Sequence, residues 1–222
     1  PSDGTVTSGK IANDAVTLSK MASGTDGNII SYDTSGNPVA VATGNDGQVL
    51  TSAGAGAIPT FETLPAGGLE VADQWRLTTS LDVADAFITA NLEQTDTGIQ
   101  GNLGSSMTQS SGVFTFPSTG FYWVKANAQF KHNSNTRQCQ FGIYGTANNS
   151  SYVQLSLQHT YITIGASGNT TTSLVTDTLI DVTNVSTHKV KFYMAGTGGG
   201  EDLQGDSSIN ATYFTFIKLG AT

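Results

Sequence analysis

Charged residues are scarce in this chain, and their scarcity argues against several classes of partner. Only 12% of the 222 residues are charged, and the nine lysines and arginines are scattered singly along the sequence. A groove that binds nucleic acid needs clustered Lys and Arg to neutralise phosphates, and an anionic membrane surface attracts similar clusters. We therefore expect no nucleic-acid partner and no binding to a membrane surface.

Long apolar runs and paired cysteines are also missing. No apolar stretch approaches the roughly 20 residues that a bilayer-spanning helix needs, so we expect no membrane insertion. The single cysteine, Cys139, cannot form an intrachain disulfide. Its alternation with Phe141 and Ile143 predicts a small, buried apolar residue. Stability must then come from packing and from association between chains.

Motifs of the common enzyme classes are absent or incomplete, so we expect no catalytic activity and no cofactor other than a bound ion. Residues 4–10 begin like a phosphate-binding loop, but Ile11 stands where Ser or Thr would hold magnesium. No Gly-x-Ser-x-Gly sequence occurs. Paired carboxylates such as Asp82 with Asp85, or Glu93 with Asp96, leave a polysaccharide depolymerase as an alternative.

Two internal repeats organise the first third of the chain. The segment 6–12 recurs at 16–22 with Val, Thr, Lys and Ala in register, and the segment 24–31 recurs at 44–51. In the second repeat an Asp-Gly turn precedes a short β-branched run and a loop with Gly and Pro, which is typical of small hairpins. A hairpin of this size is marginal alone in water, so its apolar side chains need partners.

The strings GTDGNIISYDTSGNPVAV and GNDGQVLTSAGAGAIPTF resemble repeats of phage tail-fibre and related virion proteins. The ten-residue repeat with the pattern VTxxK(I/M)A is similar to fibre-shaft sequences. The resemblance covers roughly residues 1–62 and implies an extended stalk over residues 1–66. It also implies that this N-terminal region contacts other virion proteins.

Composition changes after the Pro-Ala-Gly-Gly sequence at 65–68, which predicts a boundary between the stalk and a head over residues 67–222. Period-2 alternation sets in there, as in Val153, Leu155 and Leu157, whose apolar side chains we expect on the buried face of a sheet. Many short strands without helical periodicity predict an all-β antiparallel sandwich. The expected strands lie near 74–80, 85–92, 112–116, 120–132, 137–145, 151–164, 172–182, 187–195 and 208–219.

The segment GVFTFPSTGFYWV at 112–124 resembles TNF/C1q-like domains. Phe114, Pro117, Gly120, Tyr122 and Val124 fit the spacing of the Phe, Pro and Gly-x-Tyr-x positions that lead into a central strand of that family. The aromatic strand at the end of the chain is also similar. The resemblance implies a jelly-roll head, in which the Pro-x-x-Gly turn reverses the chain and aromatic rings fill the space between two sheets.

The last strand has apolar side chains on both faces, and a monomeric sandwich would cover only one of them. In TNF/C1q-like proteins a threefold interface covers the second face, so the resemblance implies a homotrimer here. The residues expected at that interface are Tyr122, Tyr213, Phe214, Phe216 and Ile217.

Two further sites are predicted from loop chemistry. Glu201, Asp202 and Asp206 lie in a Gly-rich segment, and carboxylates on such backbone are candidate ligands for Ca²⁺. A loop with Asn148, Asn149 and Tyr152 offers amides and a ring for binding a sugar.

These features together favour a virion structural protein on the surface of an extracellular particle. We expect a trimeric fibre or spike whose head binds a glycan or protein of the host surface. The alternatives are a head fibre or capsid decoration protein without a receptor role, the depolymerase, and a bacterial surface C1q-like protein.

Overall fold

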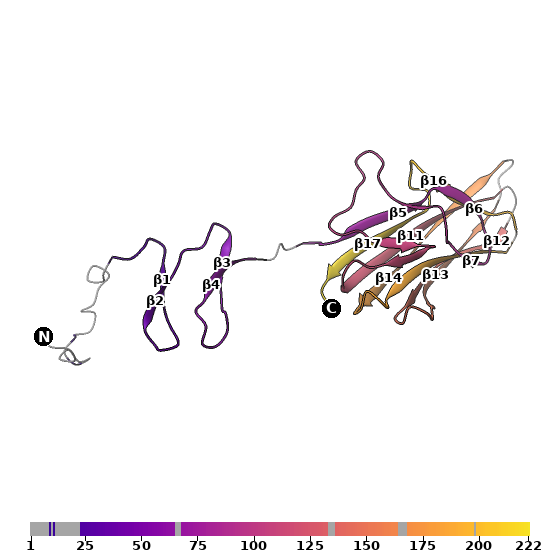
Figure 1. The fold of residues 1–222 in the computed structure, drawn as a ribbon. Coiled ribbons are helices and arrows are strands. Elements are labelled where there is room, and N and C mark those ends of the chain that lie inside the picture. The colour runs from indigo at the N-terminus through magenta and orange to yellow at the C-terminus, as the bar shows by residue number, and fades with distance from the viewer. Residues whose placement is uncertain are drawn as a thin grey trace. The chain divides into compact units, whose positions relative to one another are not determined.

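β-strands form the regular structure of the two units described below. The computed structural model describes residues 9, 11, 23–64, 68–132, 136–163, 168–197 and 199–222, and these ranges contain no α-helix. The chain divides into two compact units, residues 1–67 and 68–222, here called the hairpin unit and the head (Figure 1). Within the described ranges no helix is long and apolar enough to cross a membrane.

The hairpin unit contains two antiparallel strand pairs, as the 20-residue repeat predicted. β1 (Ile29–Tyr32) pairs with β2 (Pro38–Val41), and β3 (Gln48–Thr51) pairs with β4 (Thr60–Thr63). Gly27 and Gly47, of the two Asp-Gly turns, have φ of 79° and 82°. These positive values explain why the repeat keeps glycine at this position.

Side-chain contacts at the base of each hairpin also repeat with the sequence. In the first hairpin, Asn28 Oδ1 accepts a hydrogen bond from the Thr43 amide at 3.2 Å. In the second hairpin, Gln48 Nε2 donates to Thr63 Oγ1 at 3.4 Å. Asn28 and Gln48 are one repeat apart, as are Thr43 and Thr63. The ten-residue repeat at 6–22 lies outside the described residues except for Gly9 and Ile11.

The hairpins leave most of their apolar side chains exposed. Among the described residues of this unit, Val41 is the one apolar side chain that is buried. Ile30 and Tyr32 are 57% and 65% exposed, and Ile29, Leu50, Ile58 and Leu64 are exposed as well. The expectation that such hairpins need partners agrees with this exposure.

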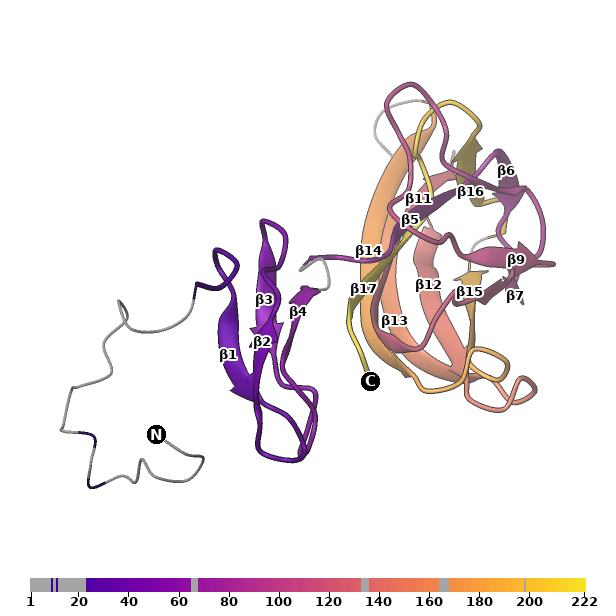
Figure 2. The same ribbon diagram turned by 60° about the vertical axis from the view of Figure 1, so that its left-hand side comes forward.

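The head consists of two antiparallel sheets (Figure 2). The first, here called the β11 sheet, has the order β14 (Thr170–Val182), β11 (Gly120–His132), β17 (Tyr213–Gly220), β5 (Ala72–Leu77) and β8 (Leu92–Gln94), with β16 (Asp202–Asp206) and β6 (Thr79–Asp82) extending from the far end of β11. The second, here called the β12 sheet, has the order β13 (Val153–Ile162), β12 (Thr136–Thr146), β15 (Lys189–Gly196), β10 (Val113–Thr115) and β9 (Thr108–Ser110), with β7 (Ala86–Phe87) beside β15.

The strand order is that of a jelly roll. If β5, β10, β11, β12, β13, β14, β15 and β17 are numbered one to eight along the chain, one sheet reads 1-8-3-6 and the other 2-7-4-5. The chain therefore crosses between the sheets repeatedly, as in two interlocked Greek keys. The predicted all-β antiparallel jelly-roll sandwich is confirmed.

Aromatic rings from both sheets fill the space between them. Phe192 of β15 and Phe214 of β17 stack with ring centroids 4.0 Å apart, and Phe141 of β12 lies against both rings. Phe114 of β10 contacts Phe216 at 5.2 Å. All five rings are at most 1% exposed, and burying each contributes about 2 kcal/mol or more.

The Pro-x-x-Gly turn is fixed by the tyrosine that follows it. The hydroxyl of Tyr122 donates to the Ser118 carbonyl at 3.1 Å, and its ring lies 4.7 Å from that of Phe116. Gly120 has φ of 141°, and a Cβ there would lie 2.4 Å from the Gly220 carbonyl oxygen. The turn therefore needs glycine at this position and places β11 beside β17.

Two details of the strand prediction are wrong. The apolar residues of β13 were expected on the buried face, but Val153 and Leu155 are 58% and 40% exposed because β13 is an edge strand outside the aromatic core. The segment from Asp202 to Asp206 was expected to be a loop, but it forms β16 between β6 and the end of β11. Pairing with distant strands decides both outcomes, and local sequence does not reveal it.

Gly112 provides a test of the core geometry. It has φ of 75° in the turn between β9 and β10, and a Cβ there would lie 1.8 Å from the Ile88 carbonyl oxygen. Gly98 also has a positive φ, 66°, but open space around its Cβ position. Both Gly→Ala changes cost about 1 kcal/mol of backbone strain. Gly112→Ala must also displace backbone, so it should lower the free energy of unfolding by about 3 kcal/mol or more. Equal losses for the two variants in chemical denaturation would contradict this packing.

Candidate assembly face and ligand surface

The outer face of the β11 sheet carries apolar side chains that the head does not cover. Trp123 of β11 lies between Ile217 of β17 and Leu179 of β14 in the strand register. Leu179 and Val175 are 64% and 50% exposed, whereas Trp123 and Ile217 are half-buried. We give the name assembly face to a subset of the outward-facing residues of these three strands: Phe121, Trp123, Lys125, Asn127, Val175, Asp177, Leu179, Tyr213, Thr215, Ile217 and Leu219.

Polar groups are interspersed on this face. Lys125 lies opposite Asp177 and Thr215, and its Nζ is 5.9 Å from the centroid of a Trp123 ring. Asn127 lies between Val175 and Tyr213 in the register, and its Oδ1 is buried without a hydrogen-bond partner among the described residues. An unsatisfied buried acceptor costs about 1–3 kcal/mol.

The residues predicted for a trimer interface separate into two groups. Tyr213 and Ile217 lie on the assembly face and are half-buried. Tyr122, Phe214 and Phe216 are fully buried in the aromatic core of their own chain. For these three the prediction is wrong, because side chains that alternate along one strand point to opposite faces and these point inward.

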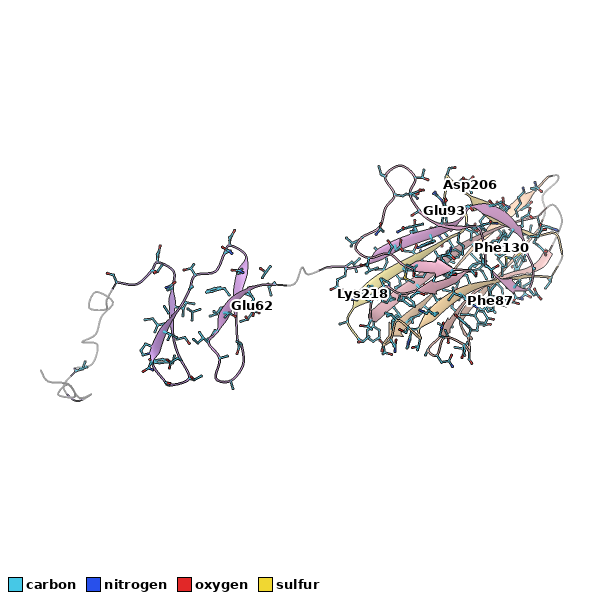
Figure 3. The ribbon with its side chains drawn as sticks, in the orientation of Figure 1. Glu62, Phe87, Glu93, Phe130, Asp206 and Lys218 are labelled. Carbon is cyan, nitrogen blue, oxygen red and sulfur yellow. The ribbon has the colours of Figure 1, made fainter. Side chains whose placement is uncertain are left out.

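The predicted calcium ligands are not brought together. Glu201 is buried and lies against Gly196, and Asp202 is half-buried on β16 opposite Asp82. Asp206, labelled in Figure 3, accepts hydrogen bonds from the Ser208 amide and hydroxyl at 2.7 Å and from the Ile209 amide. No cluster of three or more His, Cys, Asp or Glu suited to a metal occurs in the described ranges. The prediction of a three-carboxylate site is therefore wrong.

Hydrogen bonds within its own turn lower the pKa of Asp206. The hydroxyl and amide of Ser208 contribute most, followed by the Ile209 amide, and together they lower the pKa of Asp206. The carboxylate thus closes a local turn at the end of β16.

The two asparagines of the predicted sugar-binding loop stabilise the loop itself. Asn148 Oδ1 accepts hydrogen bonds from the hydroxyls of Thr146 and Ser150 and from the amides of Ser150 and Ser151. Asn149 has φ of 56°, and its amide donates to the Thr187 carbonyl. The Asn148 oxygen is therefore occupied within its own loop.

Tyr152, the third residue of that prediction, belongs to a group of rings on the outer side of the β12 sheet. Phe87 of β7, labelled in Figure 3, lies 5.1 Å from the ring of Tyr144, 5.6 Å from that of Tyr193 and 6.4 Å from that of Tyr152. Lys191 Nζ is 4.3 Å from the centroid of Tyr152 and 5.2 Å from that of Phe87. We call these five residues the aromatic–lysine cluster.

The cluster is partly shielded from water. All five residues are half-buried. Burial raises the pKa of Tyr152, and burial, followed by the charges of Asp85 and Tyr144, raises the pKa of Tyr193. The sequence placed only Tyr152 at a binding site, because Phe87, Tyr144 and Lys191 come from strands that lie far apart along the chain.

One of the two carboxylate pairs considered for a depolymerase, Glu93 with Asp96, is engaged in ion pairs. Arg76 is buried, its Nε is 2.7 Å from Glu93 Oε1, and its Nη2 is 2.9 Å from Asp96 Oδ1. Without these carboxylates the guanidinium of Arg76 would be a buried charge with no counter-ion, so the pair balances that charge. This geometry gives the pair a structural role.

Similarity to known proteins is limited to structure. No protein-family model and no curated protein matches this sequence. Among solved structures, the chain is similar to the Eiger TNF of S. frugiperda, with 12% identity and a TM-score of 0.45, over 68% of this chain and 93% of the other. The jelly-roll assignment follows from the strand order given above.

Cys139 gives a test of the interior next to Glu201. It is fully buried, as predicted, and burial, followed by the negative charge of Glu201, raises the pKa of its thiol to about 11. Since the thiolate is the reactive form, a thiol reagent at pH 8 should leave the folded protein unmodified. Addition of guanidinium chloride should make the thiol react within minutes. Rapid labelling without denaturant would contradict the packing of Cys139.

Proposed function

We propose that this chain is a virion structural protein that forms a homotrimeric fibre or spike and binds the host cell surface through its head. The observation that carries the proposal is the assembly face, where Leu179, Val175, Phe121 and Leu219 are each more than 40% exposed on the single chain. Contiguous apolar surface of this kind marks an interface. The exposed apolar side chains of the hairpin unit need cover for the same reason.

A closed, symmetric assembly fits these two surfaces. The hairpin unit and the head both expose apolar side chains, and in each unit taken by itself symmetry-related copies would cover them. The repeats that resemble phage fibre sequences support a position on a virion.

Trimer formation is tested at the assembly face. Sedimentation equilibrium of the full chain should give three times 23.0 kDa. Leu179→Asp should weaken association by about 100-fold or more, because a carboxylate buried without a partner costs several kcal/mol. Ile99→Asp makes the same change at a side chain that its own chain leaves fully exposed and should leave association unchanged. A stable wild-type monomer at micromolar concentration would contradict the proposal.

Host binding is tested on cells. The fluorescently labelled full chain should bind some members of a panel of bacterial strains, and unlabelled protein should compete. A capsid decoration protein would form the trimer but bind no strain. A depolymerase would release reducing ends from capsular polysaccharide or lipopolysaccharide, and we expect none.

A further inference from the structure

The aromatic–lysine cluster is held by strand pairing rather than by a flexible loop. Tyr144 of β12 lies opposite Lys191 of β15, and Tyr193 lies opposite Phe87 of β7. Tyr152 follows the turn after β12, where the Asn148 hydrogen bonds fix the backbone. The rings therefore have fixed positions before any ligand arrives, which lowers the entropic cost of binding.

Several polar groups of the cluster are unused. The Tyr144 hydroxyl donates to Gln154 Oε1 at 2.8 Å. Among the described residues, no hydrogen-bond partner is found for the hydroxyls of Tyr152 and Tyr193 or for the ammonium of Lys191. The ion pairs of these residues involve Arg76 and Lys218, and Lys191 takes part in none of them. An ammonium carries three donors. The rings beside Lys191 exclude part of its water, so an anion placed there would bind it more strongly than in bulk solvent.

Rings, hydroxyls and one cation form a combination suited to sugars that carry a carboxylate. The C–H face of a pyranose packs on aromatic rings, its hydroxyls bond to tyrosine hydroxyls and amides, and a carboxylate forms an ion pair with lysine. A nucleic acid would need several cations along its backbone, and the cluster offers one. The net charge of −8 is no obstacle at physiological salt, because exposed charges are screened beyond about 8 Å.

We infer that the aromatic–lysine cluster binds an acidic saccharide, with the sugar carboxylate at Lys191 and the sugar ring against Phe87 and Tyr152. This inference rests on the proposed function, since it names the class of host ligand that the head recognises.

The experiment uses the full chain and an array of immobilised uronic acid and sialic acid oligosaccharides. Each is paired with a derivative whose carboxylate has been reduced to the alcohol. Wild-type protein should bind one or more of the acidic members and lose that binding on the reduced forms. Binding should also fall as salt rises, because the ion pair is partly exposed. The inference is overturned if no acidic member is bound or if the reduced forms bind equally well.

Variants locate the site. Lys191→Gln should weaken binding of the acidic saccharide at least tenfold, and Lys131→Gln, which removes the same charge from β11, should leave it unchanged. Tyr152→Ala should abolish binding of the acidic saccharide. Tyr161→Ala is its control, because Tyr161 on β13 is 70% exposed and lies outside the cluster. Thermal unfolding should show that all four variants remain folded. Wild-type affinity in Lys191→Gln would overturn the inference.

The cell assay separates this inference from the proposed function. If the trimer binds cells and Lys191→Gln binds them equally well, the saccharide site is wrong and the proposed function stands. If the chain is a monomer that binds no cells, yet binds acidic saccharides through Lys191, the proposed function fails and the site stands.

Discussion

Contact between aromatic rings of the two sheets is the interaction on which the head depends. The stacked pair Phe192 and Phe214 joins β15 to β17, and Phe141 extends the stack to β12. No disulfide contributes, since the chain has a single cysteine. With so few charges available, most of the stabilisation comes from burying these rings and pairing the strands that carry them. The rest of the head, including both candidate surfaces, is positioned by this core.

One consequence is a clear division between the inner and outer faces of the β11 sheet. Inward side chains of β11 such as Val124 and Ala126 are fully buried, and the outward Trp123 and Asn127 alternate with them. A sheet that faced water on its outer side would carry polar residues there. The outer face of the β11 sheet instead carries tryptophan, leucine and valine among its polar residues, and this composition supports the proposed self-association.

The sequence predicted the parts of this structure that depend on local pattern. The alternation at 120–132 predicted both ends of β11 correctly, and the Asp-Gly turns predicted both hairpins. Contacts between distant segments were not accessible. Phe214 and Phe216 were expected at an interface because their strand is apolar on both faces, and the pattern alone does not say which face the chain itself covers. The aromatic–lysine cluster was likewise hidden, since Phe87 and Lys191 are brought together only by the pairing of β7 with β15.

The 20-residue repeat has a consequence for how such chains change over generations. Among the described residues each hairpin pairs only with itself, and the bonds at its base join residues at most 17 positions apart. Copying or losing one whole unit by recombination would therefore leave the neighbouring turns and pairings intact, as in other modular arrays. The number of hairpins can then change in whole repeats, without any new fold having to arise.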